Sequence, residues 1–517
     1  MKPDQYRQRF HQQLRDGLHA LAAATLDAWR LSAPQTFEPQ LHQVQLSLLN
    51  GDYRQARDAA AHLMANGDCP AKLALEALSC LKSFALHDQA LAWAEQYPRR
   101  DQIPARDLAN CATDLSGIGA HAIALEWADC AVAKACNDPV CLVNRALILS
   151  YLGHFDRARS DLHRVLAVSG HTAMAHWVLA RLPRQPSVPN QVAAIRRALA
   201  ASNLALADHA FLNFALFKEL DELGDYPAAW AALRAGNEAA RSQHPYQRAA
   251  QEQILSALKR AFPKANDAVA DDASAATAIF IVGMHRSGTS LMERMLGANA
   301  DVCAMGETER LAAAVRYGAD RFSEQIPDVA LLAEVGQINF DLIRQAFNTA
   351  AQKQTRGKRF VTEKTPGNFL NIGFIQRALP NAKIVHMRRE PVDLCFANYR
   401  ELLGKSLTHA NALDDLIHYH HGYENLLQHW QQIYPGRILD VDYEQLVQYP
   451  EAQSQRVFEF CGLPWQPEMV DLTRRISEPV STLSSVQVRQ PVNTASIGRW
   501  RPYAQWLGDL TDQFGAN

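Results

Sequence analysis

The chain has 517 residues, which is too long for a single hydrophobic core, so we expect two or three domains. Its net charge of −2 gives no reason to expect binding to nucleic acid or to an anionic membrane. The polar N-terminus lacks the apolar core of a signal peptide, and no segment approaches the roughly 18 apolar residues of a membrane span. We therefore expect a soluble, cytoplasmic protein. The nine cysteines, without a C-x-x-C pair, favour reduced thiols over disulfides or a zinc site.

The first half of the chain is rich in alanine and leucine, and small residues recur in it with a spacing of 34. This period, with turns such as Gly51-Asp52-Tyr53, resembles tetratricopeptide repeats, in which paired helices stack into a solenoid. We expect an all-α solenoid over residues 1–265, with a further helical pair near Gly224. The recurring residues are Ala56, Ala90, Ala124 and Ala158, each five residues after Gly51, Ala85, Gly119 and Gly153.

The role of these repeats is open between two alternatives. The solenoid could bind a protein partner or the acceptor of a reaction, or it could only stack on the second half of the chain or form a homo-oligomer. Residues 266–278 are small and acidic without apolar periodicity, and we interpret them as a linker. The third part of the chain is then 279–517.

This third part opens with a strand, a glycine loop and a helix. Residues 279–282 are apolar and mostly β-branched, and an amphipathic run begins near Thr289. Such a loop directs backbone N–H groups and a helix dipole at an anion. The loop keeps both glycines of a nucleoside-triphosphatase loop, but Thr289 stands where that loop has its lysine, and the charge lies at Arg286. A guanidinium in that place suits a single 5′-phosphate without magnesium.

The loop sequence GMHRSGTSL and the later segment Met305-Gly306-Glu307-Thr308 resemble the sulfotransferases that use 3′-phosphoadenosine 5′-phosphosulfate (PAPS), most closely their tyrosylprotein-sulfotransferase-like branch. The resemblance extends from about residue 279 to residue 503. It implies PAPS as the sulfuryl donor, no metal, and Glu307 as the base that takes the acceptor proton. The alternatives for Glu307 are a solvated carboxylate or a cap on a helix starting near Arg310. The donor-binding loop residues would be Arg286, Ser287, Gly288, Thr289 and Ser290, and Arg286 would also act in catalysis by helping to stabilise the leaving oxygen.

The rest of the third part has the order of a doubly wound α/β domain with a parallel sheet. Helical patterns at 330–351 and 413–434 separate the later strands. The resemblance agrees with this reading and implies a P-loop-like sulfotransferase fold. The expected strands are 279–282, 359–362, 383–387 and 437–441.

Each remaining candidate residue follows one of these strands, where ligands of such sheets gather. By resemblance, Lys364 reaches the leaving oxygen, Arg389 binds the 3′-phosphate, and Tyr443 lies beside the donor. The sequence departs from the family at Ala397, where a phosphate-binding serine is expected. Losing one hydrogen bond to a charged group would cost about 1.5–3 kcal/mol, which weakens binding without abolishing it. Asn398 points about 100° away on the helix and is not expected to compensate.

The C-terminal segment resembles the loop that closes over the phosphosulfate. It contains Ser484, Ser485 and, fourteen residues after the second serine, Arg499. Serine pairs are often only turn formers, and the matched interval is what favours a donor-binding role, with Ser485 and Arg499 also assisting catalysis. The cluster of His418, His420 and His421 does not share one helix face and is not expected to bind a metal.

Three hypotheses follow. The first is a sulfotransferase acting on a hydroxyl of a peptide tyrosine, a saccharide or a metabolite. The second is a nucleotide-dependent phosphotransferase, which the missing loop lysine disfavours. The third is a repeat scaffold with an inactive transferase half, which Ala397 keeps open.

Overall fold

The structure is a computed structural model that describes residues 1–34, 36–168, 172–184, 189–265, 275–355, 357–475 and 490–515. Two compact units are distinguished by the density of their internal packing. The first contains Met1–Ala135, Glu309–Ile326 and Gly336–Lys353, and the second contains Cys136–Thr308, Pro327–Val335 and Gln354–Asn517. The predicted linker falls mostly on residues 266–274, outside the described ranges, so the division at 265 and 279 stays a prediction.

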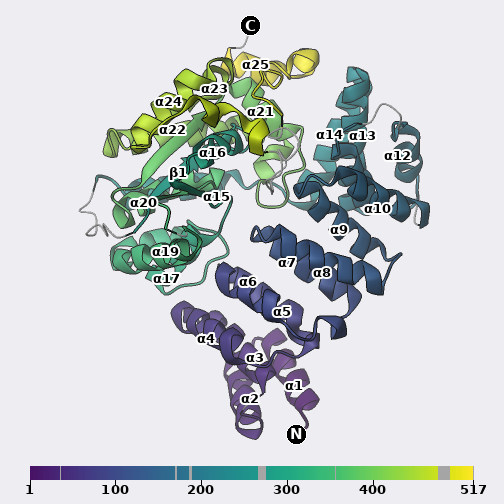
Figure 1. Ribbon diagram of the computed structural model, residues 1–517, viewed down its shortest axis with the longest axis vertical. Helices are drawn as coiled ribbons and strands as arrows, with labels where there is room; N and C mark the ends of the chain where they lie inside the picture. The colour runs from purple at the N-terminus through teal and green to yellow at the C-terminus, as the bar shows by residue number, and fades with distance from the viewer. Residues whose placement is uncertain are drawn as a thin grey trace. The chain divides into compact units, whose positions relative to one another are not determined.

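The first half of the chain is helical, as predicted, and its successive helices pack in pairs (Figure 1). The 34-residue period marks the turn within each pair. Gly51, Gly119 and Gly153 lie there with φ of 91°, 87° and 82°, and Ala85 lies at the equivalent place with φ 52°. A left-handed residue ends the first helix of the pair. The alanines five residues later, Ala56, Ala90, Ala124 and Ala158, are all fully buried. A small residue at this position lets the paired helices approach closely.

The helices of this half have the following bounds: α1 Pro3–Arg15, α2 His19–Ser32, α3 Phe37–Leu49, α4 Tyr53–Asn66, α5 Ala74–Ser83, α6 His87–Gln96, α7 Ala105–Gly117, α8 His121–Lys134, α9 Pro139–Tyr151, α10 Phe155–Val168, α11 Ala173–Arg181, α12 Val192–Leu199, α13 Leu206–Leu223, α14 Tyr226–Gln243 and α15 Arg248–Ala261. The pair expected near Gly224 is α13 and α14, with Gly224 at φ 77° between them.

Within the first unit, two helices from the C-terminal half pack with N-terminal ones. They are α17 (Arg310–Ala319) and α19 (Phe340–Thr355, of which residues up to 353 belong here). The Asp320 carboxylate accepts a hydrogen bond from the Arg54 backbone N–H at 2.8 Å, and the Arg57 guanidinium lies 5.0 Å from the centre of the Tyr317 ring. The first compact unit therefore contains residues from both sides of the linker predicted at 266–278.

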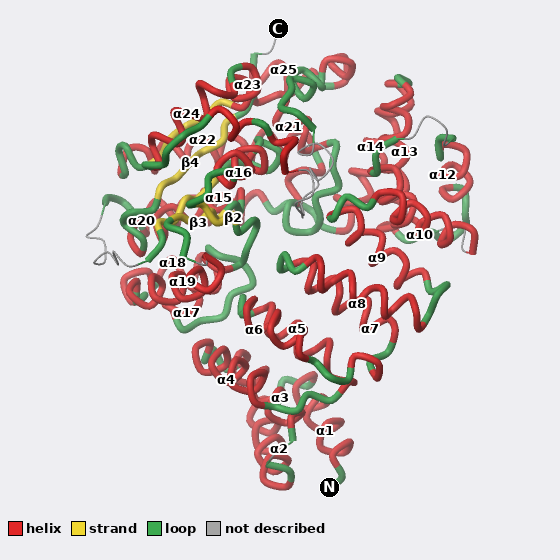
Figure 2. The backbone as a smooth tube through the Cα atoms, viewed as in Figure 1, coloured by secondary structure: helices red, strands yellow, loops and turns green. Residues whose placement is uncertain are grey.

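The second unit contains a five-stranded parallel sheet with strand order β2-β3-β1-β4-β5 (Figure 2). All four predicted strands are confirmed within two residues at their ends. The short edge strand β2 was not predicted, because three residues carry no readable period. The strands are β1 Thr277–Val282, β2 Val302–Ala304, β3 Phe360–Glu363, β4 Lys383–Arg388 and β5 Ile438–Asp442.

Helices cover both faces of this sheet. Adjacent residues of a strand point to opposite faces, so Met387 joins the core beneath α16 (Thr289–Gly297) and α24 (Pro450–Cys461), whereas His386 contacts Tyr423 of α22 (Leu413–Ile433). The remaining helices are α18 Val329–Ala333, α20 Ile372–Ala378, α21 Pro391–Tyr399, α23 Tyr443–Gln448 and α25 Gly508–Phe514.

One helical prediction needs correction. The pattern at 330–351 predicts a single helix, but the structure divides it into α18 and α19. Glu334 ends α18, and the Asn339 side chain accepts a hydrogen bond from the Leu342 backbone N–H at the start of α19. Gly336 lies between them, and glycine weakens a helix while asparagine favours its N-terminus.

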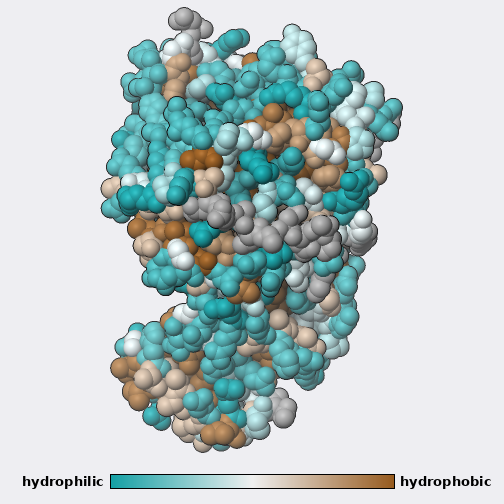
Figure 3. Space-filling model, turned by 90° about the vertical axis from the view of Figure 1, so that its left-hand side faces the viewer, coloured by the Kyte–Doolittle hydropathy of each residue, from teal (hydrophilic) through white to brown (hydrophobic). Residues whose placement is uncertain are grey.

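No helix in the described ranges is both long enough and apolar enough to cross a bilayer. Figure 3 shows a face that is largely hydrophilic, with separate hydrophobic patches.

Candidate active site

The glycine loop between β1 and α16 has a strained, tightly packed backbone. Arg286 adopts φ 68° and Gly288 adopts φ 100°. A Cβ on Gly288 would lie 2.6 Å from Cδ2 of Tyr443, so only glycine fits. Because α16 begins at Thr289, the N–H groups of its first turn are directed out of the helix end. A non-glycine residue held at positive φ beside a helix N-terminus is typical of an anion-binding site.

This loop lines a cavity of about 1130 Å³ that lies within the second unit. The cavity is strongly cationic, because eight Lys and Arg side chains among the described residues line it, against four carboxylates. Such a balance suits a ligand with several negative charges. The cations are Arg181, Arg184, Lys218, Arg286, Arg389, Arg400, Lys405 and Arg499, and the carboxylates are Glu222, Glu307, Asp393 and Glu401.

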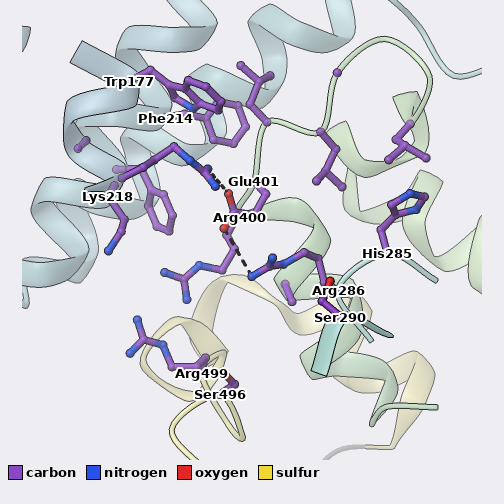
Figure 4. Close-up of a pocket in the computed structure, with 18 of the residues that line it drawn as sticks. Trp177, Phe214, Lys218, His285, Arg286, Ser290, Arg400, Glu401, Ser496 and Arg499 are labelled. Atoms are coloured by element: carbon purple, nitrogen blue, oxygen red, sulfur yellow. Dashed lines mark hydrogen bonds and ion pairs between the residues drawn. The ribbon is translucent and has the colours of Figure 1, made fainter. Parts of the chain in front are cut away.

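Glu401 connects the loop arginine to the helical region (Figure 4). Its carboxylate accepts a hydrogen bond from Arg181 of α11 at 2.6 Å and lies 3.9 Å from the Arg286 guanidinium. Burial alone would raise the pKa of Glu401, but the charges of Arg181 and Arg286 outweigh it and lower the pKa to about 2. Burial also lowers the pKa of Arg286 below its usual value. A carboxylate of such low proton affinity is a poor general base, so Glu401 holds charge in place.

The ionisation of Glu401 should make stability depend on pH. An unfolded carboxyl titrates near 4.5 and the folded one near 2, so the folded state binds fewer protons between these values. The stabilisation is therefore complete above pH 4.5 and is lost as the pH falls towards 2. We expect Glu401→Gln to be less stable than wild type at pH 6 and to lose less of its stability on acidification. Urea unfolding midpoints of both proteins, measured from pH 6 down to pH 2, test both effects. If the midpoint falls equally steeply with pH in wild type and in Glu401→Gln, the lowered pKa of Glu401 is contradicted.

Glu307 and Lys364 form the other charged pair of the site. The Lys364 ammonium donates to the Glu307 carboxylate at 2.5 Å, and the Lys364 backbone N–H donates to Gly306 O at 3.0 Å. Lys364 follows β3 directly and is 1% exposed, while the Glu307 side chain is 45% exposed and lines the cavity. The helix α17 does begin at Arg310, but its N-cap residue is Glu309, so Glu307 is not its cap. A carboxylate open to the cavity can take a proton from a bound hydroxyl.

Arg389 follows β4, on the other side of β1 from β3 and Lys364. It lines the cavity and donates to the carbonyls of Arg286 at 3.0 Å and Ser496 at 2.5 Å. Its guanidinium lies 4.9 Å from the centre of the Tyr443 ring. The structure thus brings Arg389, Tyr443 and the loop together, as their order after the strands predicts.

The next helix, α21, carries the departure from the family pattern. Ala397 lines the cavity and offers no hydroxyl. The neighbouring Asn398 is fully buried, and its amide donates to the carbonyls of His285 and Leu394, both at 2.8 Å. Asn398 therefore supports the loop backbone instead of replacing the expected serine.

Arg499 reaches the cavity from the C-terminal segment and is anchored by the helical region. Its guanidinium lies 3.1 Å from the carboxylate of Asp221 in α13, which also accepts from Arg400 at 2.8 Å and from the Tyr503 hydroxyl at 2.6 Å. Burial works to raise the pKa of Asp221, but Arg400, Tyr503 and Arg499 outweigh it, so the pKa lies below the usual value. One ionised carboxylate thus holds two cavity arginines.

Comparison with known proteins finds a family match over part of the chain. Residues 278–467 match the model of the Sulfotransferase family. Chicken (Gallus gallus) protein-tyrosine sulfotransferase 2 is 28% identical over 236 residues, which cover 43% of this chain and 62% of the relative. An uncharacterised protein from Aquifex aeolicus is 25% identical over 377 residues, covering 70% of this chain and 48% of its own length. This chain therefore spans less than two thirds of either relative.

A solved structure, the sulfotransferase domain of the Synechococcus PCC 7002 olefin synthase, is 19% identical and covers 46% of this chain and 91% of its own, with a TM-score of 0.30.

Some of the predicted site residues do not line the cavity. Ser287 is fully buried within the loop and Lys364 is almost fully buried after β3, and neither belongs to the described cavity lining. Ser484 and Ser485 lie outside the described residues. In contrast, Gly288, Thr289 and Ser290 all line the cavity, and their binding of the donor stays a prediction. Across the described ranges, no group of three or more His, Cys, Asp or Glu side chains is arranged to hold a metal ion.

Sequence reasoning missed several residues that the structure places at the site: Arg181, Asp221, Arg400 and Glu401. Asp221 is 278 positions from Arg499, and Arg181 is 220 positions from Glu401. No local pattern marks either pair. The one available signal was Arg400-Glu401 at the end of α21, close to the candidate Arg389.

Proposed function

We propose that this chain is a PAPS-dependent sulfotransferase that moves a sulfuryl group to an acceptor hydroxyl without a metal. The observation that carries the proposal is the convergence of the glycine loop, Arg389 and Glu307 on one cationic cavity, with the buried Lys364 bonded to Glu307 at 2.5 Å. The cavity fits the donor, because its cations match the donor's phosphates and Gly288, Thr289 and Ser290 of the glycine loop line it.

Each group of this chain has a defined task in the proposed reaction. The donor supplies a sulfuryl group on a phosphate leaving group. Arg286 and the loop N–H groups bind its 5′ side, Arg389 its 3′-phosphate, and Tyr443 lies beside it. Lys364 and Arg499, with Ser484 and Ser485, stabilise the negative charge on the leaving oxygen. Glu307 accepts the proton as the acceptor oxygen bonds to sulfur and the bond between sulfur and the leaving oxygen breaks.

The helical half, in the same proposal, is a tetratricopeptide-repeat-like solenoid that presents the acceptor or a protein partner to the transferase. Its support is the 34-residue recurrence of left-handed turns and buried alanines. The relatives named as protein-tyrosine sulfotransferases make a peptide tyrosine one candidate acceptor, beside a saccharide and a metabolite.

Thermal shift with adenosine 3′,5′-bisphosphate tests the donor site. A ligand at 100 times its Kd stabilises the folded state by about 2.7 kcal/mol, so the midpoint should rise. Mg·ATP at the same concentration should have a much smaller effect. Transfer of label from ³⁵S-labelled PAPS into a cell extract then distinguishes an active enzyme from an inactive scaffold. Stabilisation by Mg·ATP alone would favour the phosphotransferase instead.

A further inference from the structure

The same cavity has a second wall, built by the helical half of the chain. We call it the aromatic wall and define it as Tyr151 of α9, Phe155 of α10, Trp177 of α11, and Phe211 and Phe214 of α13. The Trp177 and Phe211 rings meet edge to face with centroids 5.5 Å apart. Figure 4 shows Trp177 and Phe214 on one side of the cavity, with His285 and Arg286 across from them.

This wall is ordered by its own contacts and is not a loose surface. The Arg181 guanidinium lies 4.8 Å from the centre of the Trp177 ring, and the same side chain is bonded to Glu401. One face of the indole is therefore covered by a fixed cation, and the ring is held in place. Phe214 is 4% exposed, so most of its surface is already packed. Ligand sites gain specificity from side chains fixed in this way before the ligand arrives.

The wall and the proposed base belong to one continuous space. Glu307 and His285 line the same cavity as Tyr151 and Trp177. Burial raises the pKa of the Tyr151 hydroxyl, the charge of Arg181 lowers it, and the charge of Glu307 adds a smaller increase. A molecule lying on the wall could therefore present a hydroxyl to Glu307.

We propose that the aromatic wall is the acceptor subsite, and that it takes a hydroxyl compound with an aromatic ring. This inference rests on the proposed sulfotransferase function. Aromatic rings favour edge-to-face and offset contacts with such a wall. Four of the five wall residues, Phe155, Trp177, Phe211 and Phe214, accept no hydrogen bond, so the wall matches the apolar face of an aromatic ring better than the many hydroxyl groups of a saccharide. In the reaction the hydroxyl oxygen on the aromatic ring bonds to sulfur and its proton passes to Glu307. The bond between sulfur and the phosphate oxygen breaks, and adenosine 3′,5′-bisphosphate leaves.

Calorimetric titration with 2-naphthol, in the presence of adenosine 3′,5′-bisphosphate, tests the subsite without requiring turnover. The full-length chain should bind 2-naphthol and should not measurably bind cellobiose at the same concentration. Trp177→Ala should raise the Kd for 2-naphthol about fivefold or more, the effect expected for losing aromatic contacts, and Phe211→Ala should act in the same direction. Trp177→Phe should recover most of the affinity.

The matched control is Tyr449→Ala, which removes an aromatic side chain that is 59% exposed and does not belong to the described cavity lining. This substitution should leave the affinities for 2-naphthol and for adenosine 3′,5′-bisphosphate unchanged. Retained binding of adenosine 3′,5′-bisphosphate by Trp177→Ala shows that the variant is folded. The subsite is overturned if 2-naphthol fails to bind a wild-type protein that binds the bisphosphate, if cellobiose binds more tightly, or if Trp177→Ala has no effect. A wild-type protein that does not bind the bisphosphate refutes the proposed function instead.

Discussion

Glu307→Gln is expected to lower kcat by roughly 10²- to 10⁴-fold, the contribution of a positioned general base. Glutamine has nearly the shape of glutamate but cannot accept the acceptor proton. The Lys364 ammonium, 2.5 Å from the carboxylate, keeps an oxygen acceptor in the amide, so the local structure should survive. Initial rates with ³⁵S-labelled PAPS and an identified acceptor measure the loss, and calorimetry should show unchanged affinity for adenosine 3′,5′-bisphosphate.

The control for this substitution is Glu309→Gln. Glu309 is an exposed carboxylate two residues further along the chain, and it does not belong to the described cavity lining. Its kcat should equal that of wild type. A Glu307→Gln enzyme with wild-type kcat would remove Glu307 from the mechanism, and the base would then have to be sought elsewhere in the cavity.

Arg286→Ala is expected to weaken binding of adenosine 3′,5′-bisphosphate by about 10- to 150-fold, because a hydrogen bond to a charged group is worth about 1.5–3 kcal/mol. Alanine keeps the Cβ that the loop already holds at φ 68°, so the backbone gains no new freedom from the change. The fold should tolerate it, since Glu401 retains its bond to Arg181 at 2.6 Å. Calorimetric titration of the purified variant gives the Kd directly.

Two further variants sharpen this result. Arg286→Lys keeps the charge but loses the planar fork of donors, so its affinity should fall between those of wild type and Arg286→Ala. Arg388→Ala removes a nearby arginine whose side chain is 47% exposed and should change the Kd little. Equal losses from Arg286→Ala and Arg388→Ala would mean that general positive charge, and not the loop arginine, binds the donor.

Much of the site was predictable because its parts are local. A strand, a glycine loop and a helix follow one another within residues 277–297, so their arrangement is set by neighbouring residues. The parallel order of the strands then predicted that Lys364, Arg389 and Tyr443 would meet the loop at one edge of the sheet. Ser287 shows the limit of this reasoning, because its place in the loop did not reveal that its side chain is buried.

The sequence by itself determined the glycine loop, the four longer strands and the helical period of the first half. Each of these rests on residues that are close in the chain or equally spaced along it. Only the tertiary structure decided that Asp221 and Arg181, from the helical half, hold Arg499 and Glu401 of the cavity. These contacts form between residues more than two hundred positions apart. Their pairing depends on how helices pack, and no local pattern encodes it.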